Sequence, residues 1–233
     1  MTWTVHKFGG TSVADASCIR RVAGIIGGQR NGNNLAVVVS AMKGVTDDLL
    51  GLVDKAAKRQ PVEATLAALR ARHEKANVEL LGAEGAKAIM ASFDQDLADI
   101  DSILKALSLV RAASHRSRDL VSGYGEIWSA RQIAAFFEQE LGQTRGVLFV
   151  NARDVLVIEH TEMGPVTAWD LSRPKLAAAI PSGFAGVAVI TGFVASDKDG
   201  LPTTLGRNGS DYSASNFGAV LHADEVHILN DVD

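Results

Sequence analysis

The feature that most constrains the fold is Leu35–Val39, a run of five apolar residues between Asn34 and Ser40. Apolar side chains without alternation indicate a strand buried on both faces, as in a parallel sheet covered by helices. The preceding residues supply the partners of this strand, because Thr2–Val5 is typical of a short strand and Ile19–Ile26 has the apolar spacing of a helix. The chain therefore opens with a predicted βαβ unit.

Strands and helices alternate through the rest of the chain, apart from one long helical stretch. No strand pattern occurs between Val45 and Leu141, where breaks are expected at Pro61, Gly82, Gly85 and Ser114. Further expected elements are strands at Gly146–Val150, Val155–Ile158, Gly186–Ile190 and Glu225–Leu229, a hairpin turning at Asp197–Gly200, and a helix at Ser210–Leu221. The pattern predicts an α/β fold, a three-layer α/β/α sandwich with a mostly parallel central sheet, in one domain over residues 1–233 with a helical insertion at roughly 45–141.

The first strand leads into a motif with the sequence Lys-Phe-Gly-Gly-Thr-Ser-Val that begins at Lys7 and is followed by a helix start at Asp15. Gly9 and Gly10 can adopt positive φ and let backbone N–H groups approach an anion, while Lys7 supplies a full positive charge. A phosphate site is therefore predicted. An ordinary strand-to-helix turn is the alternative that this motif alone leaves open.

A second motif, Leu-Gly-Arg-Asn-Gly-Ser-Asp-Tyr, begins at Leu205 and leads into an apolar helix. Arg207 suits bidentate recognition of a carboxylate or phosphate, and Ser210 can cap the helix. Asp211 could orient a lysine ammonium or hold Mg²⁺, although an acid in a first helical turn also serves the helix dipole.

For three further residues the sequence allows a purely structural role as well as a functional one. Ser40 follows a strand and could make only a side-chain turn, Thr46 could be only a helix cap, and Glu126 could be a solvated helix acid. His115 lies in a basic cluster that we interpret as a solvated helix face. The six histidines show no metal-ligand spacing.

Together the two motifs closely resemble aspartokinases, which belong to the amino-acid kinase family. The resemblance continues through Val-Ser-Ala-Met, which begins at Val39, and Ser-Gly-Tyr-Gly-Glu, which ends at Glu126, so that it covers essentially the whole chain. It implies the amino-acid kinase fold. The implied activity is transfer of the γ-phosphate of ATP to the side-chain carboxylate of L-aspartate, giving 4-phospho-L-aspartate, the first step toward lysine, methionine and threonine.

The resemblance also implies the roles of individual residues. Lys7 and Asp211 would be catalytic, with Asp211 holding Lys7 in place. The L-aspartate site would comprise Ser40, Thr46, Glu126, Arg207 and Ser210. Glu126 would face the ammonium group of the substrate, and Arg207 would bind one of its carboxylates. ATP, with Mg²⁺, would be bound by Lys7, Gly9, Gly10, Asn230 and Asp231.

Asn208 and the segment beginning at Met42 resemble those of bifunctional enzymes. A fused homoserine dehydrogenase or diaminopimelate decarboxylase is expected beyond Asp233, with the decarboxylase slightly favoured, together with the rest of the nucleotide lobe and ACT domains. The chain would then be an N-terminal substrate lobe, and a homo-oligomer is expected for the full-length protein. Two alternatives stay open: a kinase acting on glutamate, acetylglutamate or carbamate, and a non-catalytic fragment that binds aspartate or serves in assembly.

Charge and composition exclude several partners. Twenty-seven acidic residues stand against 23 lysines and arginines, without blocks of like charge, which argues against nucleic acid and anionic membranes as partners. No apolar run approaches the roughly 20 residues that cross a bilayer, and no signal peptide is recognised. Cys18 is the single cysteine, so no internal disulfide can form and a reducing cytoplasm is expected.

Overall fold

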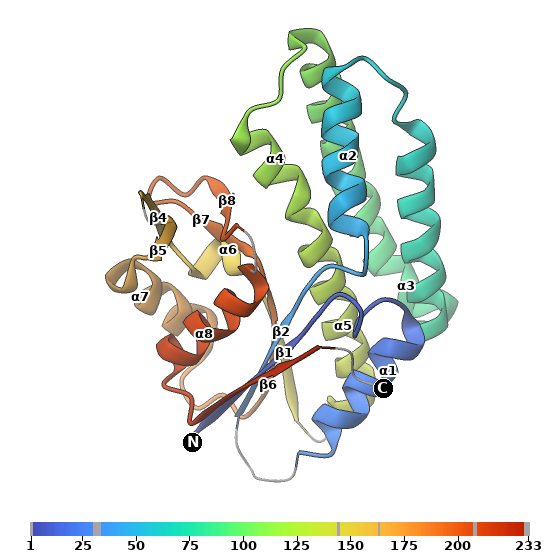
Figure 1. Ribbon diagram of the computed structural model, residues 1–233. Coiled ribbons are helices and arrows are strands. Elements are labelled where there is room, and N and C mark those ends of the chain that lie inside the picture. The colour runs from blue at the N-terminus through green and yellow to red at the C-terminus, as the bar shows by residue number, and fades with distance from the viewer. Residues whose placement is uncertain (1, 30–33, 144, 163, 207–208, 231–233) are drawn as a thin grey trace.

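The computed structural model describes residues 2–29, 34–143, 145–162, 164–206 and 209–230. Its helices are α1 (Ala16–Gly27), α2 (Val45–Ala57), α3 (Glu63–Val110), α4 (His115–Ser122), α5 (Tyr124–Leu141), α6 (Ala152–Val155), α7 (Trp169–Ala179) and α8 (Gly209–Leu221). Its strands are β1 (Trp3–Phe8), β2 (Asn34–Val39), β3 (Gly146–Val150), β4 (Ile158–Thr161), β5 (Gly164–Thr167), β6 (Gly186–Thr191), β7 (Val194–Ser196), β8 (Pro202–Thr204) and β9 (Glu225–Leu229). Figure 1 shows their arrangement.

Five parallel strands form the central sheet in the order β3-β6-β2-β1-β9. The apolar run of β2 occupies the middle of the sheet, where Val37 pairs with His6 on one side and Val189 on the other. Every residue of β2 is buried, as expected for a strand with neighbours on both edges and helices over both faces. All five strands therefore end at the same edge of the sheet.

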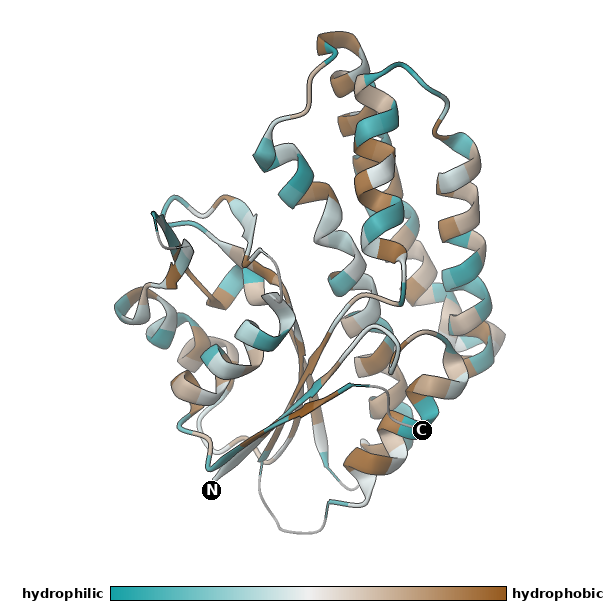
Figure 2. Cartoon of the chain, viewed as in Figure 1, coloured by the Kyte–Doolittle hydropathy of each residue, from teal (hydrophilic) through white to brown (hydrophobic). Residues whose placement is uncertain are grey.

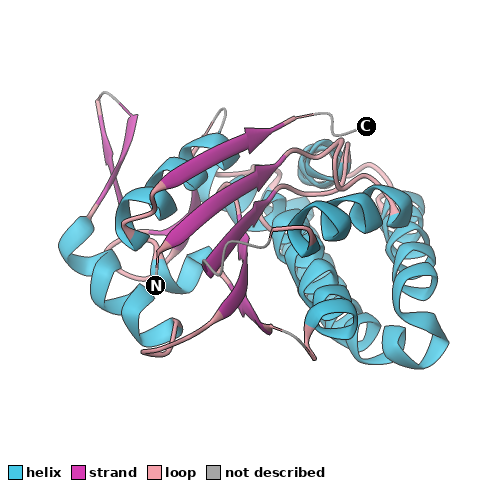
Figure 3. Cartoon of the chain, turned by 90° about the horizontal axis from the view of Figure 1, so that it is seen from below, coloured by secondary structure: helices cyan, strands magenta, loops and turns pink. Residues whose placement is uncertain are grey.

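Helices cover the two faces of the sheet and complete a three-layer sandwich (Figures 1 and 3). On one face α1 and α5 pack through residues such as Ile19 and Phe137, which are fully buried against Val37. On the other face α6, α7 and α8 bury a second core that includes Leu176 and Phe217. The predicted α/β/α sandwich with its mostly parallel sheet is confirmed, and β7 and β8 form the expected antiparallel hairpin.

Between β2 and β3 the described chain contains only the helices α2 to α5, of which α2, α3, α4 and the start of α5 form an arm beside the sheet (Figure 1). A core of buried apolar side chains holds the arm together, including Leu49, Phe93 and Trp128. Figure 2 shows apolar and polar residues alternating along the helices of the arm. The long α3 bends at Gly82, whose φ of 73° and ψ of 171° interrupt the helix at one of the expected breaks. No helix in the described part of the chain is long and apolar enough to cross a membrane.

Several local predictions were wrong. Lys7 lies inside β1, which extends to Phe8 because β2 and β9 pair with it over its length. The predicted strand at Val155–Ile158 is instead the end of α6 and a short link to β4, since the Asn151 side chain accepts from the Arg153 N–H at 3.1 Å and starts a helix there. The hairpin β4–β5 and helix α7 were not predicted, and α7 carries Pro174 inside a helical stretch.

Candidate active site

A cavity of about 990 Å³ lies at the carboxyl ends of β1 and β2 and reaches the helices α2, α4, α5 and α8. Ligand sites are expected at this edge of an open parallel sheet. The cavity brings together nine of the residues predicted for the site: Lys7, Gly9, Gly10, Ser40, Thr46, Glu126, Ser210, Asp211 and Asn230. Two others, Arg207 and Asp231, lie outside the described residues.

Lys7 is the buried cation of this cavity, with only 4% of its surface exposed. Its Nζ lies 2.6 Å from Asp211 Oδ1 at the start of α8 and donates to Asn230 Oδ1 at 3.0 Å, just after β9. Burying an ammonium group is costly unless it is paired and hydrogen-bonded, and these two side chains meet that requirement. The ammonium is thereby held at one point on the cavity wall.

Gly9 and Gly10 line the cavity beside Lys7, but neither has the positive φ that their sequence suggested. Close packing, which leaves no space for a side chain, explains the two glycines instead. A Cβ on Gly10 would lie 2.9 Å from the Ala41 carbonyl oxygen, and one on Gly9 would lie 3.0 Å from Asn230 Oδ1. Gly10 therefore lets the loop after β1 pack closely against the loop after β2, where the Lys43 N–H donates to the Gly10 carbonyl at 3.1 Å. Gly9 leaves room for the Asn230 side chain after β9.

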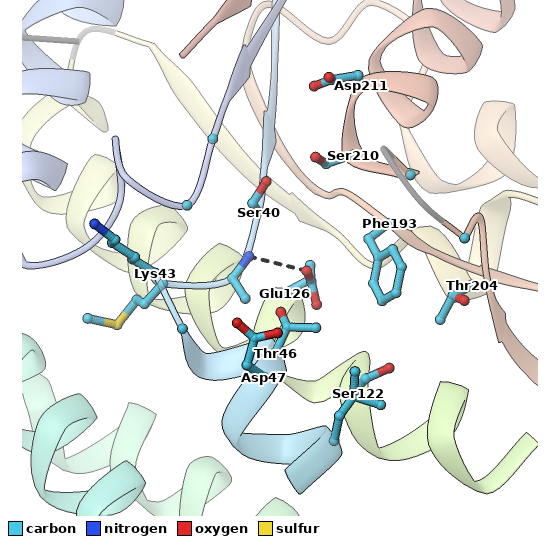
Figure 4. Close-up of a pocket in the computed structure, with 18 of the residues that line it drawn as sticks. Ser40, Lys43, Thr46, Asp47, Ser122, Glu126, Phe193, Thr204, Ser210 and Asp211 are labelled. Carbon is cyan, nitrogen blue, oxygen red and sulfur yellow. Dashed lines mark hydrogen bonds between the residues drawn. The ribbon is translucent and has the colours of Figure 1, made fainter. Parts of the chain in front are cut away.

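Glu126 lies in the first turn of α5 and is 4% exposed, which rejects the solvated-acid alternative. Its Oε1 accepts from the Ala41 N–H at 3.3 Å (Figure 4), and its Oε2 has no hydrogen-bond partner among the described residues. Burial raises the pKa of the Glu126 carboxyl to about 8, against the lowering influence of the Ala41 amide and the Arg153 charge. A buried carboxylate with a free oxygen is suited to accept a cation from a ligand.

The remaining predicted residues come from separate elements and face the same space in Figure 4. Ser40 follows β2, and Ser210 lies next to Asp211 in the first turn of α8. Ser210 is not a helix cap, because α8 already begins at Gly209. Thr46 is not a cap either, since Gly44 with a φ of 83° precedes α2 and makes no side-chain bond. Their hydroxyl groups are thus not needed to cap these helices.

Sequence reasoning missed Asp119, a buried carboxylate on the cavity wall. Its two oxygens accept from the hydroxyl groups of Thr203 at 3.0 Å and Thr204 at 3.2 Å, and His115 Nδ1 lies 3.3 Å away. These contacts tie α4 to the β7–β8 hairpin. The two threonines are more than 80 residues away along the chain, so no local spacing could have indicated this link.

Phe193 was also missed, although it lines the cavity and has a φ of 64°. Positive φ is uncommon for a bulky residue and marks a place where the surroundings impose the conformation. The Phe193 N–H donates to Ser213 Oγ at 2.8 Å, and its carbonyl accepts from the Leu205 N–H at 2.8 Å. The basic cluster at His115 lies on an exposed helix face, as interpreted, and its member Arg118 pairs with Asp54 of α2.

The fold and the cavity define an α/β protein whose site is lined by a buried lysine, by close-packed glycines and by a buried carboxylate. A family model described as "Amino acid kinase family" matches residues 2–233. The chain therefore belongs to the amino acid kinase family, as its motifs suggested.

Within this family, the chain is similar to aspartokinases. Over 99% of its length the chain is 35% identical to a bifunctional aspartokinase/homoserine dehydrogenase of Arabidopsis thaliana, and over 98% it is 33% identical to one of Escherichia coli. It spans only 25% and 27% of those two proteins. The crystal structure of E. coli aspartokinase III in complex with aspartate and ADP matches 98% of this chain and 49% of its own, with 27% identity and a TM-score of 0.83. The fused part in these bifunctional relatives is homoserine dehydrogenase, not the decarboxylase favoured from the sequence.

Proposed function

We propose that this chain is the catalytic region of an aspartate kinase, which transfers the γ-phosphate of ATP to the side-chain carboxylate of L-aspartate and yields 4-phospho-L-aspartate. One observation carries the proposal: the same cavity is lined by Lys7 with the glycines that follow it and by the buried carboxylate of Glu126. The named relatives and the E. coli structure bound to aspartate and ADP support the same activity.

The phosphate end of the site would comprise Lys7 with the loop at Gly9 and Gly10. Phosphoryl transfer asks the protein mainly to position the reactants and to neutralise charge on the transferred group. A lysine held by Asp211 and Asn230 needs little reorganisation to do this, because its ammonium is already fixed at the cavity wall. In this proposal Lys7 is the phosphate contact and Asp211 is the group that positions it.

The amino-acid end would comprise Glu126, Ser40, Thr46 and Ser210, with Arg207 added from the sequence resemblance. The free Oε2 of Glu126 is suited to the substrate ammonium group. The side-chain carboxylate of aspartate is already ionised at neutral pH and can attack the γ-phosphorus directly. No general base is therefore required.

ATP and Mg²⁺ are the proposed cofactors, with Asn230 and Asp231 near the adenosine. In the described part of the chain, no group of three or more His, Cys, Asp or Glu side chains could hold a metal ion. This fits Mg²⁺, which proteins commonly bind through one or two carboxylates together with substrate phosphates. When bound, the metal would neutralise charge on the phosphates, and Asp211 is the carboxylate beside the phosphate end of the cavity.

The wider context is proposed from the sequence resemblance and, for the bifunctional enzyme, from the named relatives. We propose that the reaction is the first step toward lysine, methionine and threonine, and that the full-length protein is a homo-oligomeric, bifunctional enzyme of the cytoplasm. The buried free thiol of Cys18 is compatible with a reducing compartment.

The test uses the full-length protein with Mg-ATP and measures ADP release with L-aspartate, L-glutamate, N-acetylglutamate and carbamate. L-Aspartate should be turned over fastest, and Lys7→Ala should lower kcat by two or more orders of magnitude, since losing one transition-state charge contact costs about 3 kcal/mol or more. Lys175→Ala, on the exposed side of α7, is the matched control and should keep normal turnover. Faster turnover of another acceptor, or unchanged kcat in Lys7→Ala, would refute the assignment.

Arg207→Lys tests the other end of the site. Lysine keeps the positive charge but cannot form the bidentate hydrogen bonds of arginine. The KM for aspartate should therefore rise, while the KM for ATP changes little.

A further inference from the structure

Arg153 lies just beyond the carboxyl end of β3, as the second residue of α6, and is half-buried. It reaches across to the junction between α4 and α5. There Nη2 donates to the Leu120 carbonyl oxygen at 2.8 Å, and the guanidinium carbon lies 5.5 Å from the centre of the Tyr124 ring. The first contact satisfies one of the last carbonyls of α4, and the second is a cation–π contact with the first residue of α5.

Gly123, between the two helices, shows how tightly this contact is made. Its φ of −69° is open to any residue, so the backbone does not require glycine. A Cβ at this position would overlap Arg153 Nη2 and would lie 2.6 Å from Val194 Cγ1. The glycine therefore leaves room for the arginine, and the arginine contacts the junction on both sides of it.

Glu126 follows this junction by three residues, within the same first turn of α5. Arg153 is the cation that favours ionised Glu126 against the effect of burial, and Glu126 in turn opposes the lowering of the Arg153 pKa by burial. Other charged or titratable side chains reach the same cavity from β1, the loop and start of α2, α4 and α8: Lys7, Lys43, Asp47, His115, Arg118, Asp119 and Asp211.

We propose that Arg153 is a positioning residue, which locks the α4–α5 junction so that Glu126 is held toward the amino-acid end of the cavity. It acts through the junction and through its charge, without contacting the substrate itself. The part played by Glu126 rests on the proposed function, whereas the locking of the junction rests on the contacts of Arg153 alone.

The test compares Arg153→Gln and Arg153→Lys in the full-length protein, with Arg145→Gln and Arg145→Lys as matched controls. Arg145 is also half-buried and donates to a main-chain carbonyl, but this carbonyl is that of Gln29, after α1, and not one at the α4–α5 junction. Arg153→Gln should raise the KM and Kd for L-aspartate at least tenfold and leave the KM for ATP within twofold. Aspartate binding should require a higher pH in Arg153→Gln, because no cation then favours ionised Glu126. In Arg153→Lys this pH should return toward the wild-type value, because lysine restores the positive charge.

A second variant displaces the arginine without changing it. Gly123→Ala should reproduce the weaker aspartate binding, since the added methyl group occupies the space of the guanidinium. Equal changes in the constants for aspartate and ATP, or an unmoved pH dependence in a folded Arg153→Gln protein, would overturn the proposal.

Hydrogen exchange separates this proposal from the proposed function, because it needs neither substrate nor turnover. The amides of residues 122–126 should exchange at least tenfold faster in Arg153→Gln than in Arg145→Gln. If the wild-type protein failed to bind aspartate while this difference appeared, the proposed function would be wrong and the positioning role would stand. Equal exchange rates would refute the positioning role.

Discussion

At the scale of single residues, Glu126 illustrates a conflict between stability and binding. Its carboxyl group has a pKa of about 8 in the folded protein, where burial disfavours the charged form, against 4.5 for an ordinary glutamate. Between these two pH values the folded chain keeps a proton that the unfolded chain has lost. Stability should therefore fall as pH rises from about 4.5 to about 8.

Glu126→Gln should remove this pH dependence. Relative to wild type without ligand, the variant should gain about 3 kcal/mol of stability between pH 5.5 and pH 8.5, because each pKa unit corresponds to about 1.4 kcal/mol. Denaturant unfolding at pH 5.5 and 8.5 measures the difference. Glu140→Gln, exposed on the same helix, is the control and should show none. If the free energies of unfolding of the variant and the wild type differed by the same amount at both pH values, the prediction would be contradicted.

The site residues that could be predicted from the sequence are those whose neighbours in the chain indicate their chemistry. Lys7 is followed by two glycines, and Asp211 stands in a glycine-rich helix start, so short segments were enough. Asp119, Arg153 and Phe193 act through contacts with distant segments, and their local sequence is unremarkable. The reason for the glycines was also beyond the sequence, because only packing shows that Gly10 lies against the Ala41 carbonyl.

At the scale of elements, the bend in α3 depends on Gly82. Its backbone angles fall in a region that is essentially restricted to glycine, although nothing lies within 4 Å of the position that a Cβ would take. Gly82→Ala should therefore destabilise the protein by about 1–3 kcal/mol through backbone strain alone. Thermal or denaturant unfolding provides the measurement.

Gly24→Ala is the matched control for that substitution. Gly24 lies inside α1 with helical geometry and equally open space, so alanine should stabilise the protein by up to about 1 kcal/mol. Opposite signs for the two substitutions are expected. The same sign for both would show that the bend at Gly82 is not imposed by its backbone angles.

Asp119 joins two elements that meet at the cavity, the helix α4 and the strand β8. Asp119→Ala would leave the hydroxyl groups of Thr203 and Thr204 without their acceptor in a buried place. We expect a loss of about 2 kcal/mol in the free energy of unfolding, whereas Asp99→Ala on the exposed face of α3 should change it by less than about 0.5 kcal/mol. A loss no larger than that of Asp99→Ala would show that the two hydroxyls find other partners.

The sequence located strands well where an apolar run had clear boundaries, and less well where the run was short. The strands β2, β3, β6 and β9 were predicted within one residue of their bounds, since each is bounded by polar or turn residues. The link between β3 and β4 was misassigned because Val155–Ile158 is apolar but too short to separate a strand from a helix end. Tertiary pairing also extended β1 by three residues beyond its apolar start.

At the scale of the whole molecule, the cavity lies between the sheet and the helical arm, so a ligand that contacts both should hold them together. L-Aspartate at 100 times its dissociation constant should stabilise the chain by about 2.7 kcal/mol and raise Tm by roughly 5–11 °C. Glu126→Gln should abolish the shift, and L-glutamate at the same concentration should produce a smaller one. An equal shift with both amino acids would argue against an aspartate-specific site.

The pairing of Lys7 with Asn230 has a consequence for the order in which the protein is made. These partners are separated by 223 positions in the chain, and the other partner of Lys7, Asp211, is also far along it. At 5–20 residues per second, a ribosome needs about 10–45 seconds to travel from one to the other. During that interval the lysine has neither of its two partners. The nascent chain can complete its βαβ opening early, but the lysine that anchors the site is fixed only after Asp211 and Asn230 have been made.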